Sequence, residues 1–243
     1  MLLEAAFWGL AGASSLVIAA EVAFAFRLSK MTIGLIMAFG VGALISSIAF
    51  ELVAPSFAVM GTLRVGLGLL AGAFTFFFGD MAIDRLGGTG RKSLDGPAEG
   101  SSGLGITLGT ILDGIPESAV LGMSLAAGSG VSVALLAAIW VSNFPEALGG
   151  TVGLQGSGTS KRGIRLMWVK IVLISAVSAG IGYAIVNNVP GLSGAFAQAF
   201  AAGALLTMIA DEMAPEAFSR SYKYAGVATT FGFILAVILT TLE

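Results

Sequence analysis

The chain contains no cysteine and no histidine. Without cysteine it forms no disulfide and no thiolate metal site. Without histidine it lacks the commonest metal ligand and the usual proton carrier near neutral pH. Charge is also scarce: charged residues are 11% of the 243 residues and the net charge is −2, whereas a soluble domain carries about 25% charged residues. The composition argues against a soluble protein, and the lack of a concentrated basic face argues against nucleic-acid binding.

Hydrophobic residues make up 56% of the sequence and gather in long runs. Crossing about 30 Å of hydrocarbon takes about 20 helical residues. The runs of this size predict eight transmembrane helices at residues 4–26, 31–54, 63–84, 104–127, 131–153, 166–186, 194–217 and 225–242. The first run opens on Glu4 and is longer than a signal-peptide core, so we interpret it as a helix. We expect one all-α transmembrane domain over residues 1–243.

Lysine and arginine residues predict the orientation, because cytoplasmic loops retain them. Ten of the twelve lysine and arginine residues lie in the links that follow the first, third, fifth and seventh predicted helices. They are Arg27, Lys30, Arg85, Arg91, Lys92, Lys161, Arg162, Arg165, Arg220 and Lys223. These links, including a cytoplasmic loop at 85–103, should face the cytoplasm. We therefore expect a multi-pass protein of the cell (inner) membrane with both termini extracytoplasmic.

Two Pro-Glu pairs, at 116–117 and 145–146, interrupt the central apolar runs. Proline has no backbone N–H, so each one frees the carbonyl four residues earlier, and carboxylates are costly in hydrocarbon. The short link at 128–131 predicts an antiparallel hairpin in which both pairs reach mid-membrane. One pair alone is common at the start of a soluble helix, but the repetition favours an ion site. The alternative is proline-kinked packing with incidental acids.

Five polar residues of this hairpin are the candidate metal ligands. Asp113 with Glu117, and Ser142 with Glu146, are four apart and share a helix face, while Asn143 borders Glu146. Two such faces turned together would offer three carboxylates, a hydroxyl, an amide and the freed carbonyls. Three buried carboxylates repel one another unless they are protonated or recruit a cation. We therefore predict an oxygen-rich cation site.

The two Pro-Glu segments resemble the metal-binding helices of the ZIP family of divalent-metal transporters, whose fourth helix typically reads His-Asn-x-Pro-Glu-Gly or His-Ser-x-Pro-Glu-Gly and whose fifth is similar. The likeness extends over the whole chain, with eight spans, external termini and a three-two-three plan. By this resemblance, Asp113 and Ser142 stand at the leading ligand positions, Asn143 at the next, and Glu117 and Glu146 at the motif glutamates. The resemblance also implies transport toward the cytoplasm by an elevator-like movement of one helix group past another.

The sequence departs from the family pattern at several positions. Gly114 stands where a side-chain ligand is usual, Ser118 and Ala147 replace the motif glycines, and neither motif has a histidine. The remaining all-oxygen ligand set suits Mn²⁺, Mg²⁺ or Ca²⁺ better than Zn²⁺, although zinc also accepts carboxylate oxygen. The substrate ion is left open among Zn, Mn, Fe and Cd.

A short echo within the sequence hints at an inverted repeat of the first and last three helices. Glu51 precedes Pro55 by four residues near the end of the second predicted helix, and Asp211 precedes Pro215 by four near the end of the seventh. Proline is common at helix ends, so chance similarity is the alternative.

Other ionisable residues are candidates for supporting roles. Lys170 could act as a tethered cation beside the site or reach the cytoplasmic interface, and Glu21 could line the path or lie at the interface. The acidic residues that we place near external helix ends would concentrate cations at an entrance or form a solvated rim. These are Glu51, Asp211, Glu212 and Glu216. Asp80 and Asp84 are interpreted as boundary residues.

The sequence thus predicts a divalent metal-ion transporter with no enzymatic activity. The expected partners are the lipid bilayer and the metal substrate, with no nucleic acid, and a homodimer is one candidate assembly. A non-transporting metal sensor or scaffold of the same fold is the alternative. An intramembrane hydrolase is a remote one, since Gly79-Asp80 matches only a weak fragment of an aspartyl-protease motif.

Overall fold

The computed structural model describes residues 1–83, 85, 103–128, 130–189 and 193–242. Within these ranges every regular element is a helix, which confirms the all-α prediction. Asp84 and nearly all of the predicted loop 85–103 lie outside the described residues.

The structure contains ten α-helices and two π-helices within the described residues. Their bounds are α1 (Leu2–Ala25), α2 (Lys30–Ser47), η1 (Ile48–Val53), α3 (Ala54–Met60), α4 (Thr62–Ile83), α5 (Gly103–Ala126), α6 (Val133–Gly156), α7 (Lys161–Asn188), α8 (Gly194–Met208), η3 (Ile209–Met213), α9 (Ala214–Ser221) and α10 (Tyr224–Leu242). The segments η1 and η3 are π-helical and join α2 to α3 and α8 to α9. Seven of the described helical stretches are long and apolar enough to cross a membrane, and α5 matches α1 at 24 residues.

Serine caps fix where several helices begin. The side chain of Ser160 accepts a hydrogen bond from the backbone N–H of Gly163, which starts α7 at Lys161 and not at 166 as expected. An N-cap serine satisfies a backbone donor that the helix itself leaves unpaired. Lys161, Arg162 and Arg165 therefore lie in the first turns of α7, whereas we had placed them in a loop.

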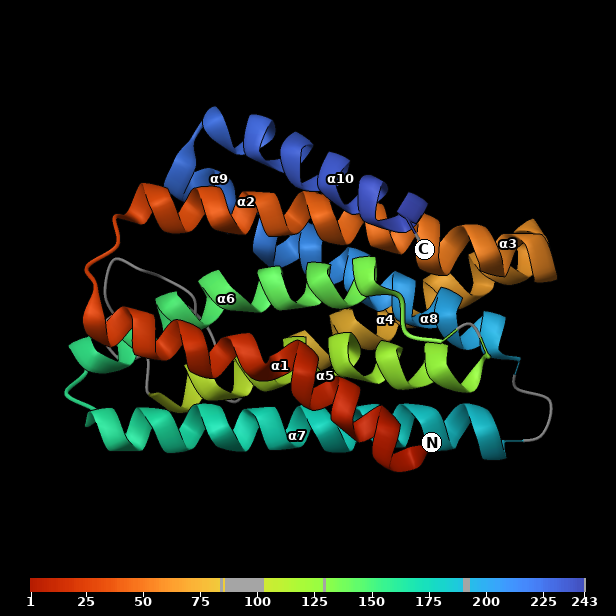
Figure 1. Cartoon of the computed structure of the whole chain (residues 1–243), viewed down its shortest axis with the longest axis horizontal. Helices are drawn as coiled ribbons and strands as arrows, with labels where there is room; N and C mark the ends of the chain where they lie inside the picture. Colours follow the sequence, from red (N-terminus) through yellow and green to blue (C-terminus); the bar gives the residue numbers. More distant parts are fainter. Residues whose placement is uncertain (84, 86–102, 129, 190–192, 243) are drawn as a thin grey trace.

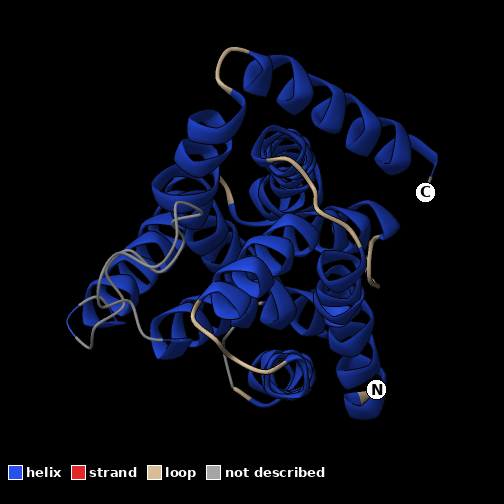
Figure 2. Ribbon diagram, turned by 90° about the vertical axis from the view of Figure 1, so that its left-hand side faces the viewer, coloured by secondary structure: helices blue, strands red, loops and turns tan. Residues whose placement is uncertain are grey.

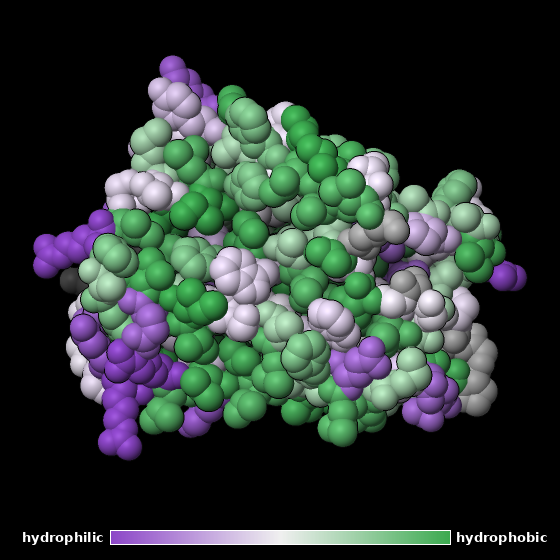
Figure 3. Space-filling view, in the orientation of Figure 1, coloured by the Kyte–Doolittle hydropathy of each residue, from purple (hydrophilic) through white to green (hydrophobic). Residues whose placement is uncertain are grey.

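The long helices run roughly along one direction of the molecule (Figure 1). The α1–α2, α6–α7 and α9–α10 links lie at one end, and both chain termini lie toward the other. Viewed from the end that bears these links, most of the helices are seen nearly end-on, while α10 is tilted (Figure 2). In Figure 3 the visible face is mostly apolar along its middle and carries most of its strongly hydrophilic residues toward the two ends. This pattern is typical of a protein with a membrane-facing apolar belt.

The largest buried apolar cluster lies mainly between α2, α5, α6 and α8. Examples are Leu44 of α2, Leu121 of α5, Ile139 of α6 and Leu205 of α8, each at most 1% exposed. The hairpin helices α5 and α6 are therefore held between two continuous rods, α2–η1–α3 and α8–η3–α9. This packing places the central polar residues inside the bundle.

One placement made from sequence is wrong. We expected Asp211, Glu212 and Glu216 to share the external end with Glu51. The structure puts η3 and α9 toward the end that carries the basic links, whereas η1 lies toward the end that carries the termini (Figure 1). The reason is that α2 and α8 begin at opposite ends of the molecule, so the ends of their rods cannot meet on one side.

Candidate metal-binding site

Both hairpin helices continue through their prolines. Pro116 lies inside α5 and Pro145 inside α6. Because each helix is unbroken, residues four apart stay on one face. Asp113 therefore lies one turn before Glu117 on the same face of α5, as the spacing predicted.

The two candidate faces meet inside the bundle. Asp113, Glu117 and Ser142 are each 2% exposed. The hydroxyl of Ser142 lies 3.0 Å from Oε1 of Glu117 and donates a hydrogen bond to it across α5 and α6. The same hydroxyl lies 2.9 Å from the carbonyl oxygen of Ile139, to which its one proton can also be donated. When the Ser142 hydroxyl donates to that carbonyl, its oxygen can act as a neutral ligand.

The remaining acids lie one level away from this contact. Since α5 and α6 form an antiparallel hairpin, the pairing of Glu117 with Ser142 sets Asp113 at about the height of Glu146. Four residues along a helix correspond to about 6 Å. Among the described residues, no group of three or more histidine, cysteine, aspartate or glutamate side chains could hold a metal ion. The convergence of three carboxylates on one ion stays a prediction.

Neutral groups complete the surroundings of the site. Asn143 is 3% exposed, and its Oδ1 is buried with no hydrogen-bond donor among the described residues. A buried amide oxygen in that state is costly, and it is a suitable ligand for a hard cation. Gly40 of α2 packs against Ser142: a Cβ placed on Gly40 would lie 3.1 Å from the Ser142 Cα. Behind α5, Gly114 faces the hydroxyl of Ser175 on α7 at 3.6 Å from its ideal Cβ.

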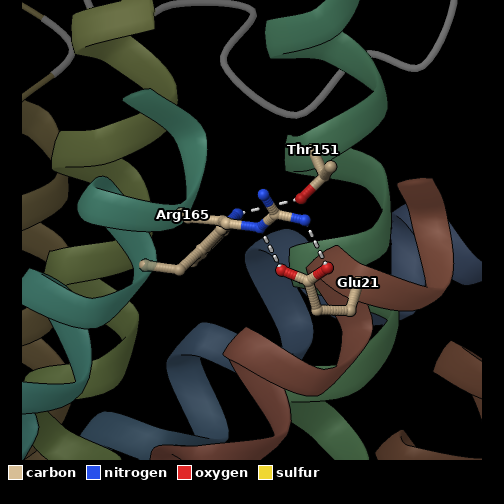
Figure 4. A network of polar contacts seen from close by, with 4 residues as sticks. Glu21, Thr151 and Arg165 are labelled. Carbon is tan, nitrogen blue, oxygen red and sulfur yellow. Dashed lines mark hydrogen bonds and ion pairs between the residues drawn. The ribbon is translucent and has the colours of Figure 1, made fainter. Parts of the chain in front are cut away.

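Glu21 and Lys170 do not join the buried site. Lys170 is exposed on α7, which favours its reaching the interface over acting as a tethered cation. Glu21 makes a two-pronged ion pair with Arg165: Nη2 of Arg165 donates to Glu21 Oε2 at 2.8 Å, and its Nε donates to Oε1 (Figure 4). Both side chains are about half exposed. The pair links α1 to α7 at the end with the basic links, where Phe24 also lies under the guanidinium.

A neighbouring contact fixes α6 against α7. The indole Nε1 of Trp168 donates to the hydroxyl of Thr151 at 2.9 Å, and both residues are fully buried. Thr151 lies beside the ion pair of Glu21 and Arg165 (Figure 4). The helices α1, α6 and α7 are thus tied together near the end that carries the basic links.

The acidic residues of the two π-helical segments are placed differently from one another. Glu51 of η1 is half-buried, and its Oε1 accepts no hydrogen bond from the described residues. Asp211 of η3 is exposed and Glu212 is half-buried. Asp80 lies in α4 and is half-buried. The π-helices themselves were not predicted, although the Glu51–Pro55 and Asp211–Pro215 echo marks their positions.

Sequence reasoning also missed a buried ion pair. Arg220, which we had placed in a cytoplasmic loop, lies in α9 with its side chain 6% exposed and pairs with Glu216 one turn earlier. A carboxylate one turn away compensates the buried charge. Gly34 of α2 allows the close approach, since a Cβ there would lie 2.6 Å from the Arg220 Cβ. The four-residue spacing of Glu216 and Arg220 was the feature of the sequence that could have predicted this pair.

In comparisons with known proteins, the sequence matches no family model and no curated protein.

Proposed function

We propose that this chain is a divalent metal-ion transporter that moves its substrate through the polar interior between α5 and α6. The observation that carries the proposal is the buried contact between Glu117 and Ser142 inside a bundle of apolar, membrane-length helices. Ionisable groups at such depth are expensive and mark ion pathways. The resemblance of the two Pro-Glu segments to the ZIP family supports this class and the direction toward the cytoplasm.

The substrate ion would be held by Asp113, Glu117, Ser142, Asn143 and Glu146. The acids occupy two levels of the hairpin, and a transported ion must be bound weakly enough to leave. Carboxylates spread along the path fit this need better than a closed cage of ligands. The absence of histidine and cysteine from the sequence leaves an all-oxygen set, which favours Mn²⁺ or another hard ion over Zn²⁺.

We further propose a three-two-three plan in which α1, α2–α3 and α4 form an inverted repeat with α7, α8–α9 and α10. Reciprocal glycine contacts support it. On α2 and α10, a Cβ at Gly42 would lie 1.8 Å from the Thr229 oxygen, and one at Gly232 would lie 1.9 Å from the Phe39 oxygen. The corresponding pair, α8 and α4, has the same kind of glycine contact. The two halves also share a π-helix at the same place, since η1 leads to Pro55 and η3 leads to Pro215.

Competitive uptake is the experiment that tests the proposal. Purified protein in liposomes, offered Mn²⁺, Zn²⁺, Fe²⁺, Cd²⁺ and Mg²⁺ together, is expected to accumulate Mn²⁺ in preference to Zn²⁺. The physical reason is that oxygen ligands favour harder cations. Metal content measured by mass spectrometry, against empty liposomes, gives the order. A preference for zinc would contradict the assigned ligand set, and no accumulation of any of these ions would contradict transport.

Gly40 provides a second test, because it sets the distance between α2 and the site. A methyl group there must push against the Ser142 backbone. We expect Gly40→Ala to displace Ser142 from Glu117 and to reduce metal uptake severalfold with only a modest fall in stability. The matched control is Gly66→Ala, since a Cβ at Gly66 meets nothing within 4 Å. Equal uptake by both variants and the unmodified protein would show that the α2–α6 contact does not position the site.

The second candidate function is a metal-binding sensor or scaffold that does not transport. It is favoured by the departures from the family pattern, since Gly114 stands at a usual ligand position and neither Pro-Glu segment has a histidine. Calorimetric metal binding without accumulation in liposomes would support this second function over the first.

A further inference from the structure

An apolar crevice of about 370 Å³ opens between α4, α5, α7 and α8. Its volume falls in the range of about 300–1,000 Å³ that is typical of ligand pockets. The lining includes Phe76 of α4, Pro116 and Ala119 of α5, and Ala201 of α8. None of the described lining residues is charged, and the hydroxyl of Thr75 is already donated to the Ala71 carbonyl at 2.7 Å. The crevice therefore suits an apolar ligand.

The crevice lies between two helix pairs that are each closely packed. In the pair α5 and α7, a Cβ on Gly122 would lie 1.8 Å from the Ala179 oxygen, and one on Gly182 would lie 2.3 Å from the Ala119 oxygen. In the pair α4 and α8, Gly72 meets the backbone of Phe200 in the same way. Because their backbones are in direct contact, the two helices of each pair cannot move closer together. Neither pair can spread to fill the space between them.

The mouth of the crevice faces the apolar surface of the bundle. Ile115, Ile181 and Ile185 line it and are 42%, 53% and 41% exposed. They belong to helices of membrane length, so the medium that meets them in a bilayer is lipid hydrocarbon. A helix from a second copy is about 10–12 Å across with its side chains, too wide to enter a space of this volume. A single hydrocarbon chain is thin enough.

We propose that one acyl chain of a membrane phospholipid occupies this crevice. The chain would lie against Pro116, next to Glu117, and would fill the contact between the α5–α7 and α4–α8 pairs. The proposal depends on membrane insertion and not on metal transport. It makes the crevice a lipid-binding site through which the bilayer touches the helix that carries the candidate ligands Asp113 and Glu117.

The test is phospholipid retention by the full chain. The protein is extracted from membranes, exchanged through a mild detergent, and weighed intact by native mass spectrometry. We expect one phospholipid per chain in the unmodified protein and in Ala71→Phe, which alters an exposed position of α4 outside the crevice. Ala119→Phe, which fills the crevice, should lose that lipid. Equal retention by Ala119→Phe, or no retained lipid in the unmodified protein, would overturn the proposal.

A second measurement keeps the test decisive if Ala119→Phe does not fold. Phe200 is half-buried and lines the crevice, so a phenylalanine analogue with a small photoreactive azide on its ring at this position changes the lining little. After detergent exchange and illumination, the expected product is the chain plus one phospholipid. A product that joins two protein chains would identify a second copy as the occupant and refute the acyl-chain proposal, as would a chain without any added lipid.

Discussion

Replacing Gly72 by alanine is expected to destabilise the protein strongly by forcing α4 away from α8. An alanine Cβ at this position would lie 1.8 Å from the carbonyl oxygen of Phe200, whereas a carbon–oxygen contact is normally about 3.3–3.6 Å. From the other helix, Gly203 faces the Leu69 oxygen at 2.0 Å. The obstacle is backbone on both sides, so no side-chain rotation relieves it. Overpacking of this kind costs about 1–3 kcal/mol and occasionally more.

The measurement is thermal unfolding of the purified protein, followed by the loss of its monodisperse peak on size-exclusion chromatography. The control lies on the same helix: a Cβ at Gly66 meets nothing within 4 Å, and alanine favours a helix over glycine by about 1 kcal/mol. Gly66→Ala should therefore leave the unfolding temperature unchanged or raise it, while Gly72→Ala lowers it. Equal unfolding temperatures for the two variants would mean that α4 and α8 are not in backbone contact.

The helical fold was predictable because apolar runs of about 20 residues have few alternatives to a membrane helix. The residues at which the helices begin were less predictable. Ser160 caps α7 so that the helix begins at Lys161, five residues before the expected start, and charge alone had assigned Lys161 and Arg162 to a loop. Such a boundary depends on a hydrogen bond between a polar side chain and a backbone N–H, which a hydropathy pattern does not reveal.

The candidate site was predictable along each helix but not between helices. The four-residue spacing of Asp113 and Glu117 specified a shared face, and the hairpin specified that α6 would run back beside α5. The register was not specified, because no sequence pattern says that Ser142 lies opposite Glu117. Long-range pairs such as Glu21 with Arg165 were unpredictable for the same reason. Their partners are 144 residues apart, so only the packing of α1 on α7 brings them together.

Removing the negative charge of Glu117 and Glu146 together is expected to abolish metal uptake. A buried site that loses the anions which compensate its cation loses about 3–5 kcal/mol, and each 1.4 kcal/mol is about a tenfold change in affinity. The double variant Glu117→Gln, Glu146→Gln should therefore bind metal at least 100-fold more weakly. Glutamine retains the volume of glutamate, so the apolar packing around α5 and α6 is kept and the loss reports charge.

Two further variants separate the site from general damage. Ser142→Ala removes one hydroxyl that contacts Glu117, and a single hydrogen bond is worth about 1 kcal/mol, so uptake should fall less than tenfold. Glu4→Gln alters an exposed carboxylate in the first turn of α1 and should leave uptake unchanged. Initial uptake rates in liposomes, at metal concentrations below saturation, give this order. Uptake by the double glutamine variant equal to that of Glu4→Gln would remove Glu117 and Glu146 from the ion path, because a cation cannot cross a buried anionic site unaffected by the loss of its charge.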